Sequence, residues 1–207
     1  MYDRNSIIGM RIMASGALIM TAYFLLFAAV HSLLADPAFK GRAVDRGYGR
    51  WQRPAYNLLS LLMMLPFIAI LFLPDRMIYT ITPPWMWAMM AGQILAAGAA
   101  IATLHRTGLS RFLGLDQVLR GGDAAGVDEL VKGGIYSRVR HPLYVFAILF
   151  LWLSPCMTES LLAFNLSATL YFLLGALHEE RSLLEQFGQE YEEYRQSVPM
   201  FLPRLRS

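Results

Sequence analysis

Two clusters of polar residues at the ends of apolar segments have side chains suited to chemistry. The first precedes an apolar segment at 143–153 and consists of Lys132, Gly133, Gly134, Ile135, Tyr136, Arg138, Arg140, His141, Pro142 and Tyr144. Paired glycines let backbone N–H groups approach a ligand closely, and the guanidinium fork of Arg140 suits a carboxylate. Pro142 suits the first turn of a helix, whose N-terminus favours an anion. The cluster therefore predicts a site for an anionic group or, alternatively, a basic anchor at a membrane edge with Tyr144 in the aromatic belt.

The second cluster is His178, Glu179 and Glu180, directly after an apolar segment at 161–177. A helix that ended there would present its negative dipole end to two adjacent carboxylates, which would then need cationic partners. If segments 143–153 and 161–177 form a helical hairpin, Glu179 or Glu180 can meet Arg140, His141 or a bound cation. The alternative is a charged stop at the membrane surface followed by a solvated helix.

The elements that must position both clusters are membrane helices. The 207 residues are 56% hydrophobic and 16% charged, with a mean hydropathy of +0.42, which is too apolar for an ordinary soluble domain. A helix needs roughly 20 apolar residues to cross a bilayer, and five segments come near this length: 12–30, 57–73, 85–104, 143–153 and 161–177. We predict an all-α polytopic fold with about five transmembrane helices in one integral membrane domain, 1–207. Residues 1–104 would hold three membrane helices. Residues 105–207 would hold the loop with the first polar cluster, the helical hairpin and a C-terminal helix.

The charged residues predict the orientation of these helices. Basic residues follow the first, third and fifth segments, whereas Arg76 alone lies between the second and third, and none lies between the fourth and fifth. Because cytoplasmic loops are enriched in Lys and Arg, we expect an N-terminus outside and a C-terminus in the cytoplasm, in a bacterial inner membrane. The net charge of +3 is spread over short loops, so we expect the lipid bilayer rather than nucleic acid as partner.

Other features narrow the function classes. The single cysteine, Cys156, excludes an internal disulfide framework and a cysteine-based metal site, and the four histidines lack close metal-ligand spacing.

The segment 105–141 is rich in glycine, which predicts a structured loop with unusual turns: Gly108, Gly114, Gly121, Gly122, Gly126, Gly133 and Gly134. After Glu179, apolar residues recur at steps of three and four and predict a C-terminal helix with one apolar face: Leu183, Phe187, Tyr191, Tyr194 and Val198.

The segments VRHPLY at 139–144 and HEERSLLEQFGQEYEEYRQSVPMFLP at 178–203 resemble the superfamily of isoprenylcysteine carboxyl methyltransferases and phospholipid methyltransferases. The connection SPCMTES at 154–160 is similar to the branch that includes bacterial methanethiol S-methyltransferase. HSLLADPAFK at 31–40 and RFLGLDQV at 111–118 look like that branch more loosely.

The resemblance implies a site for S-adenosyl-L-methionine, built from the loop before the fourth helix and the acidic pair after the fifth. It implies catalytic roles for Arg140, His141 and Glu179. It implies a cofactor pocket lined by Lys132, Gly133, Gly134, Ile135, Tyr136, His141, Pro142, Tyr144, Glu179 and Glu180. Arg53, Tyr56, Asn57, Tyr191 and Tyr194 are candidates for the acceptor side. No Gly-x-Gly-x-x-Gly fingerprint of the soluble dinucleotide fold is present.

The acceptor and the reaction class leave alternatives open. In eukaryotic isoprenylcysteine enzymes an arginine one turn before the acidic pair is associated with recognition of the acceptor carboxylate, whereas this chain has Gly175. The expected acceptor is therefore a small or lipophilic molecule, with a thiol favoured. The alternatives are lipid methylation, isoprenylcysteine-type carboxyl or amine methylation, an NADPH-dependent membrane reductase, and a non-catalytic membrane factor. Binding of S-adenosylmethionine, of NADPH or of neither would discriminate among these classes.

Overall fold

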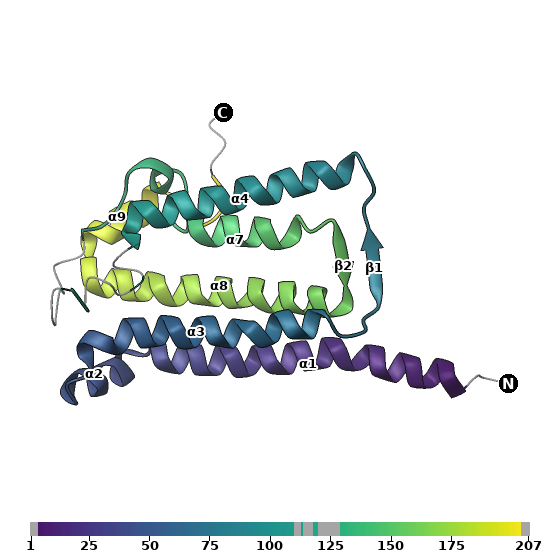
Figure 1. Ribbon diagram of the computed structural model, residues 1–207. Helices are drawn as coiled ribbons and strands as arrows, with labels where there is room; N and C mark the ends of the chain where they lie inside the picture. Colours follow the sequence, from purple (N-terminus) through teal and green to yellow (C-terminus); the bar gives the residue numbers. More distant parts are fainter. Residues whose placement is uncertain (1–3, 110–112, 114–117, 120–128, 204–207) are drawn as a thin grey trace. The chain divides into compact units, whose positions relative to one another are not determined.

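The computed structural model describes residues 4–109, 113, 118–119 and 129–203 (Figure 1). Of the predicted glycine-rich loop, Gly114, Gly121, Gly122 and Gly126 lie outside the described residues, as does most of the segment 111–118. The described elements, in chain order, are α1 (Arg4–Ala35), α2 (Pro37–Asp45), α3 (Gly49–Leu71), β1 (Met77–Thr80), α4 (Trp85–Thr107), the 3-10 helix η1 (Gly134–Ser137), α7 (Pro142–Trp152), β2 (Cys156–Thr158), α8 (Glu159–Phe187) and α9 (Gln189–Ser197).

The long helices are membrane helices. Four of the described helices are long and apolar enough to cross a bilayer: Gly16–Ala35 within α1, then α3, α4 and α8. The fourth predicted segment is α7, an apolar helix of 11 residues, about 16 Å long at 1.5 Å per residue. The prediction of an all-α polytopic membrane protein is confirmed, and α7 is shorter than a bilayer core of about 30 Å.

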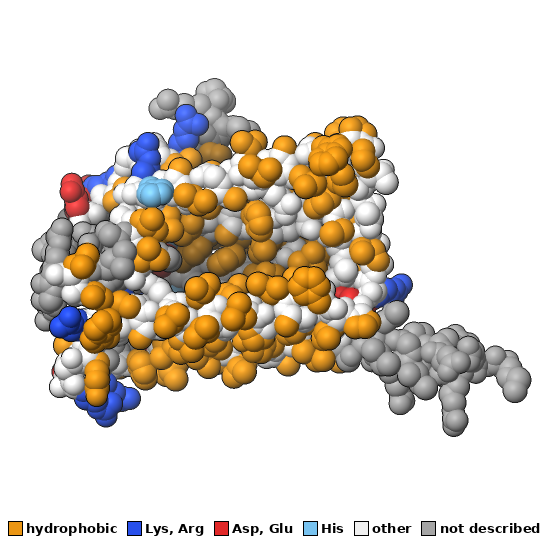
Figure 2. Space-filling model, viewed as in Figure 1, with side chains coloured by type: hydrophobic (Ala, Val, Ile, Leu, Met, Phe, Trp, Pro, Cys, Tyr) orange, Lys and Arg blue, Asp and Glu red, His pale blue; other side chains and the backbone are white. Residues whose placement is uncertain are grey.

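The chain forms two compact units. The first comprises Met1–Met86, Ser110–Ala124 and Pro155–Ala168, and the second Trp87–Leu109, Ala125–Ser154 and Thr169–Ser207. In the first unit α1 lies along α3 (Figure 1). An aromatic cluster joins both helices to the start of α8. Phe67 lies 5.5 Å from Phe24 and 5.1 Å from Phe164, measured between ring centroids. Figure 2 shows hydrophobic side chains along α1 and α3 and Lys or Arg side chains at the α2 end.

A small antiparallel sheet, which the sequence does not predict, ties two connections of the first unit together. Met77 of β1 pairs with Thr158 of β2, and Thr80 pairs with Cys156. The Asp75 carboxylate accepts a hydrogen bond of 2.8 Å from the backbone N–H of Ser160, at the start of α8. The connection between α3 and α4 therefore lies at the same end as the connection between α7 and α8.

In the second unit α7 is fastened to two neighbours. The Gln93 amide of α4 donates to the backbone carbonyl of Phe150, and the Trp152 indole donates to the Thr169 hydroxyl of α8, each at 3.0 Å. Gly188 lies between α8 and α9 with φ 55°, a backbone region that favours glycine. The expected C-terminal helix is thus two helices that meet at Gly188.

The prediction that the fifth helix ends just before the acidic pair is wrong. Helix α8 continues to Phe187, so Glu179 and Glu180 lie inside it. The helix continues because Leu183, Leu184 and Phe187 pack against a buried cluster on α9 and beyond, which consists of Tyr191, Tyr194 and Val198. The two carboxylates are therefore not placed against a helix C-terminus, and their positions are explained by their side-chain partners.

Candidate active site

The site in the second unit begins at a tight turn before α7. Gly134 opens η1 with φ 66°, and a Cβ there would lie 2.6 Å from Nη1 of Arg106 at the end of α4. Glycine suits this position because a side chain would be strained in this backbone region, and its Cβ would also displace the guanidinium group. The turn thus brings η1 close to Arg106.

We expect Gly134→Ala to lower the stability of the protein by about 1–3 kcal/mol, because alanine at this φ is strained and its Cβ displaces Arg106. Gly133→Ala is the matched control, since φ is −89° there and an added Cβ would have no described atom within 4 Å. The thermal denaturation midpoint of the detergent-purified protein is the measurement. Equal midpoints for the two variants would contradict this account of the turn.

A buried ion pair joins the start of α7 to α8. Arg140 Nε donates to Glu180 Oε1 at 2.6 Å and its Nη2 donates to Glu180 Oε2 at 2.9 Å, with both side chains about nine-tenths buried. This geometry is bidentate, the strongest arrangement of an arginine with a carboxylate. The expectation that an acid of the 178–180 cluster meets Arg140 is confirmed for Glu180.

The remaining guanidinium donors fix the segment after α9. Arg140 Nη1 donates to the backbone carbonyl of Arg195 at 2.9 Å and also to that of Val198. The backbone N–H groups of Arg140 and His141 donate to the carbonyls of Pro199 and Met200 at 2.9 and 3.1 Å. Arg140 therefore holds three parts of the unit together: the loop before α7, helix α8 and the segment that follows α9.

His141 completes the buried network. Its ring is 4% exposed, and Nε2 lies 3.1 Å from Glu180 Oε1. Because an ionised carboxylate can only accept, Nε2 carries the proton of this hydrogen bond, and in a neutral ring Nδ1 keeps its lone pair. The ring stacks on Tyr144, with 5.6 Å between centroids and 9° between planes, and lies 5.9 Å from the ring of Phe201.

Glu179 is the more exposed member of the acidic pair. Its side chain is 48% exposed, and Oε2 accepts a hydrogen bond of 3.0 Å from the Tyr144 hydroxyl. His141 Nδ1 lies 3.7 Å from the same oxygen, beyond hydrogen-bonding distance. Tyr144 also stacks on Phe172 of α8, and its hydroxyl lies 3.9 Å from where a Cβ on Gly175 would be. Glu179 is thus held in place yet accessible to a ligand.

Three tyrosines line the side of the site formed by η1 and α9. Tyr191 and Tyr194 are buried, and the Tyr194 hydroxyl donates to the backbone carbonyl of Tyr136 at 2.6 Å. Burial, with the nearby charge of Glu179, raises the pKa of Tyr136 to about 12, and burial raises that of Tyr194 to about 12. Burial and the Glu180 carboxylate likewise raise the pKa of Tyr191. These phenols therefore stay protonated near neutral pH and do not serve as bases; Tyr194 acts as a donor, whereas the buried Tyr191 hydroxyl has no hydrogen-bond partner among the described residues.

The structure brings most of the predicted site residues together in the second unit. Lys132 is at the surface, where its Nζ lies 2.6 Å from Glu190 Oε1 of α9. Pro142 is buried at the first turn of α7, and the backbone carbonyl of Ile135 accepts from the N–H groups of Arg138 and Val139. Arg53, Tyr56 and Asn57 belong to α3 in the first unit, so their predicted acceptor role stays a prediction.

The sequence does not predict that the segment after α9 contributes contacts to the site. Pro199 and Met200 contribute backbone carbonyls, and Phe201 contributes a ring against His141. Backbone acceptors have no side-chain signature, so the one signal in the sequence was the SVPMFLP stretch within the segment that resembles the methyltransferase superfamily.

The charges of the site indicate which ligand it suits. Arg140 and Glu180 neutralise one another in the interior, which leaves Glu179 as the accessible carboxylate of the acidic pair. A half-exposed carboxylate beside aromatic rings attracts a cationic, partly apolar ligand. Among the described residues, no three His, Cys, Asp or Glu side chains are placed to share a metal ion.

Comparison with known proteins points to one family. Residues 86–190, which include Arg140, His141, Glu179 and Glu180, match the family model "Phospholipid methyltransferase". Methanethiol S-methyltransferase 2 of Bradyrhizobium diazoefficiens is 36% identical over 194 residues, which cover 87% of this chain and 70% of that protein. Methanethiol S-methyltransferase of Pseudomonas deceptionensis is 29% identical over 203 residues, with 87% and 70% covered.

A more distant relative is the protein-S-isoprenylcysteine O-methyltransferase of Schizosaccharomyces pombe, which is 40% identical over 81 residues. The matched segment covers 37% of this chain and 34% of that protein. No solved structure matches the chain significantly.

Proposed function

Since this chain belongs to the phospholipid methyltransferase family and is a multi-pass membrane methyltransferase, we propose that it methylates a small thiol with S-adenosylmethionine as donor. The observation that carries the proposal is Glu179, a half-exposed carboxylate held by the Tyr144 hydroxyl beside the buried Arg140–Glu180 pair.

The residues of the second unit fit this donor. S-adenosylmethionine carries an ammonium and a sulfonium, which a carboxylate attracts, and when bound it supplies an electrophilic methyl group and leaves as a neutral thioether. Glu179 would hold the cationic part, and the backbone of Gly133, Gly134, Ile135 and Tyr136 would line the remainder, with Lys132 at the rim. Tyr144, Pro142 and the ring of His141 would form an apolar and aromatic wall.

Arg140 and Glu180 would act as positioning residues. Their side chains are buried and bound to each other, and Arg140 also binds the carbonyls of Arg195 and Val198. This engagement favours a role in holding Glu179 and His141 in place over a direct contact with the carboxylate of the donor. Little covalent machinery is required, because the enzyme chiefly has to align the acceptor and exclude water.

The thiol proton has a candidate acceptor in His141. Its Nε2–H donates to Glu180, so Nδ1 retains a lone pair on the side of Glu179, with 3.7 Å between Nδ1 and Oε2. Proton transfer from the thiol to Nδ1 would make the thiolate, which is the reactive form of a thiol. Glu179 would hold the cationic donor, whose positive charge offsets that of the Glu179 carboxylate next to the thiolate.

A thiol suits the local structure better than a carboxylate acceptor. The face of α8 next to Tyr144 carries Phe172 and Gly175, neither of which offers a cation to an acceptor carboxylate. The relatives that cover most of the chain are named methanethiol S-methyltransferase, and methanethiol is small, apolar and uncharged.

We infer an N-terminus outside and a C-terminus in the cytoplasm, in a bacterial inner membrane. The pairing of β1 with β2 supports this orientation, because it joins the two connections that are poorest in basic residues. The site would then lie at the cytoplasmic face, where a water-soluble donor is present.

The experiment that tests the function uses detergent-purified protein with S-adenosylmethionine labelled in its methyl group. With methanethiol we expect labelled dimethyl sulfide and one S-adenosylhomocysteine per product, measured by headspace gas chromatography and liquid chromatography. Phosphatidylethanolamine and farnesylcysteine, tested in parallel, represent amine and carboxyl acceptors. Transfer to one of these in preference to methanethiol would overturn the thiol assignment, and failure to bind S-adenosylmethionine would overturn the choice of donor.

A further inference from the structure

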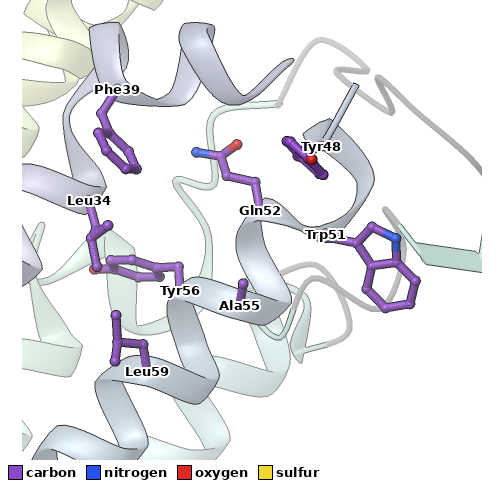
Figure 3. A pocket seen from close by; sticks show the side chains of 8 residues that line it. All are labelled: Leu34, Phe39, Tyr48, Trp51, Gln52, Ala55, Tyr56 and Leu59. Atoms are coloured by element: carbon purple, nitrogen blue, oxygen red, sulfur yellow. The ribbon is translucent and has the colours of Figure 1, made fainter. Parts of the chain in front are cut away.

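The first unit contains an apolar pocket apart from the polar clusters described in the second unit. It has a volume of about 300 Å³ and is formed by the end of α1, by α2 and by the first turns of α3. Figure 3 shows Phe39 and Leu34 on one side of it, Tyr48 and Trp51 on the other, and the Gln52 side chain directed into the space between them. Ala55, Tyr56 and Leu59 complete the lining. A volume of this order suits a small ligand or part of an acyl chain.

Two arginines line a second cavity that adjoins this pocket. The second cavity, of about 430 Å³, is lined by Phe39, Arg42, Arg46 and Tyr48, so it shares Phe39 and Tyr48 with the first. Among the described residues, the side chains of Arg42 and Arg46 form no hydrogen bond or ion pair, and both are exposed. An apolar pocket that continues into two available guanidinium groups matches a molecule with one apolar and one anionic end.

The surrounding segment is strongly cationic. Residues 36–57 contain Lys40, Arg42, Arg46, Arg50 and Arg53 but only two acids, Asp36 and Asp45. The Asp36 carboxylate accepts hydrogen bonds from the backbone N–H groups of Ala38 and Phe39, so it caps α2. The acids of this segment therefore offset only part of its positive charge.

Lys40 supports the same conclusion. Burial, together with the positive charge of Arg53, lowers the pKa of the Lys40 ammonium, and Asp36 offsets this only in part. Two cations close enough to disfavour one another would both gain from an anion placed between this segment and the solvent. The aromatic side chains Tyr48 and Trp51 are those that favour the headgroup level of a bilayer.

We propose that this surface binds one acidic phospholipid, with part of an acyl chain in the Leu34–Leu59 pocket and the phosphate between Arg42 and Arg46. The charge decides between occupants: a lipid without a phosphate would leave both arginines unpaired, and a zwitterionic phospholipid would add its own headgroup cation to an already cationic segment. A soluble phosphate would leave the apolar lining empty. A small methyl acceptor such as a thiol has no group for two guanidinium ions. The site would therefore be separate from methyl transfer and would anchor α2 to the acidic lipids of the membrane.

The test is retention of lipid by the full chain in detergent, measured by native mass spectrometry with phosphatidylglycerol as the probe. We expect saturable binding of one molecule, with affinity reduced roughly 10- to 30-fold in the double variant Arg42→Gln/Arg46→Gln. Ala55→Phe, which fills the apolar pocket but keeps both arginines, should reduce binding to a similar extent. Arg76→Gln/Arg181→Gln removes the same charge elsewhere and should bind as the unaltered protein does.

Each other outcome would overturn the proposal. Equal retention of phosphatidylcholine would mean that the arginines do not select the ligand. Equal losses in both double variants would mean that only net charge matters. Inorganic phosphate is added as a competitor of phosphatidylglycerol to the Ala55→Phe variant and to the unaltered protein. Equally strong competition in both proteins would indicate that the ligand is a soluble anion. A raised KM for the thiol in Ala55→Phe, with lipid binding unchanged, would assign the pocket to the acceptor.

Discussion

Replacing Glu179 by glutamine is expected to weaken S-adenosylmethionine binding by roughly 10- to 100-fold, the loss that follows from removing the charge of a charge-assisted contact. Glu179 is the half-exposed carboxylate of the site, and its oxygen Oε2 is held by the Tyr144 hydroxyl. Glutamine has the same size and can still accept from Tyr144, so the fold should be retained. Isothermal titration of the detergent-purified protein is the measurement.

A comparison of two ligands makes this experiment sharper. S-adenosylhomocysteine keeps the ammonium but lacks the positive charge on sulfur. If Glu179 attracts the sulfonium, the variant should lose more affinity for S-adenosylmethionine than for S-adenosylhomocysteine. Equal losses would place Glu179 at the ammonium instead. Glu185→Gln, on an exposed position of the same helix, is the control and should bind both ligands normally. Unchanged binding by Glu179→Gln would remove this residue from the site.

Arg140→Met is expected to destabilise the protein by about 3–5 kcal/mol, the cost of leaving one member of a buried ion pair without its partner. The variant would leave the Glu180 carboxylate buried, and it would also release the carbonyls of Arg195 and Val198. We expect a large drop in the thermal denaturation midpoint and loss of activity. Arg138→Met, two residues earlier and exposed, is the matched control.

The double variant Arg140→Met/Glu180→Met separates a positioning role from a direct one. Removing both charges should restore much of the stability lost in the single variant, because no buried charge remains unpaired. If Arg140 acts chiefly by neutralising Glu180, the double variant should also bind S-adenosylmethionine more tightly than Arg140→Met does. Restored stability with no recovery of binding would instead indicate that Arg140 acts through another contact, either with the donor or with the carbonyls of Arg195 and Val198.

The sequence was sufficient to predict the membrane helices and the meeting of the two polar clusters. Long apolar segments have a length that the bilayer dictates, so the predicted segment 85–104 agrees closely with α4, Trp85–Thr107. The meeting of Arg140 with an acid of the 178–180 cluster could be predicted because a short connection folds two consecutive helices back on one another, so that residues before the first helix lie near residues late in the second. These inferences depend on lengths and charges, which are local properties of the chain.

The features that were not predicted depend on contacts between distant residues. Strands β1 and β2 are only four and three residues long, and neither has an alternating pattern that distinguishes it from a loop. Helix α8 passes through Glu179 and Glu180 because Leu183 and Phe187 find partners on α9, which a reading of the charges alone does not reveal. Likewise, the carbonyls of Pro199 and Met200 bind the loop at Arg140 through backbone atoms that every residue has.

The pairing of β1 with β2 constrains the order in which the parts of the protein assemble. Thr80 precedes its partner Cys156 by 76 positions, so α4 and α7 must be synthesised before the sheet can form. Until then β1 is an unpaired edge, and the aromatic cluster of α1 and α3 lacks Phe164. The first unit is therefore completed late, after its own helices have entered the membrane. Substitutions in Cys156–Thr158 would accordingly appear as reduced amounts of protein in the membrane, through degradation of incompletely assembled chains, and not as altered catalysis.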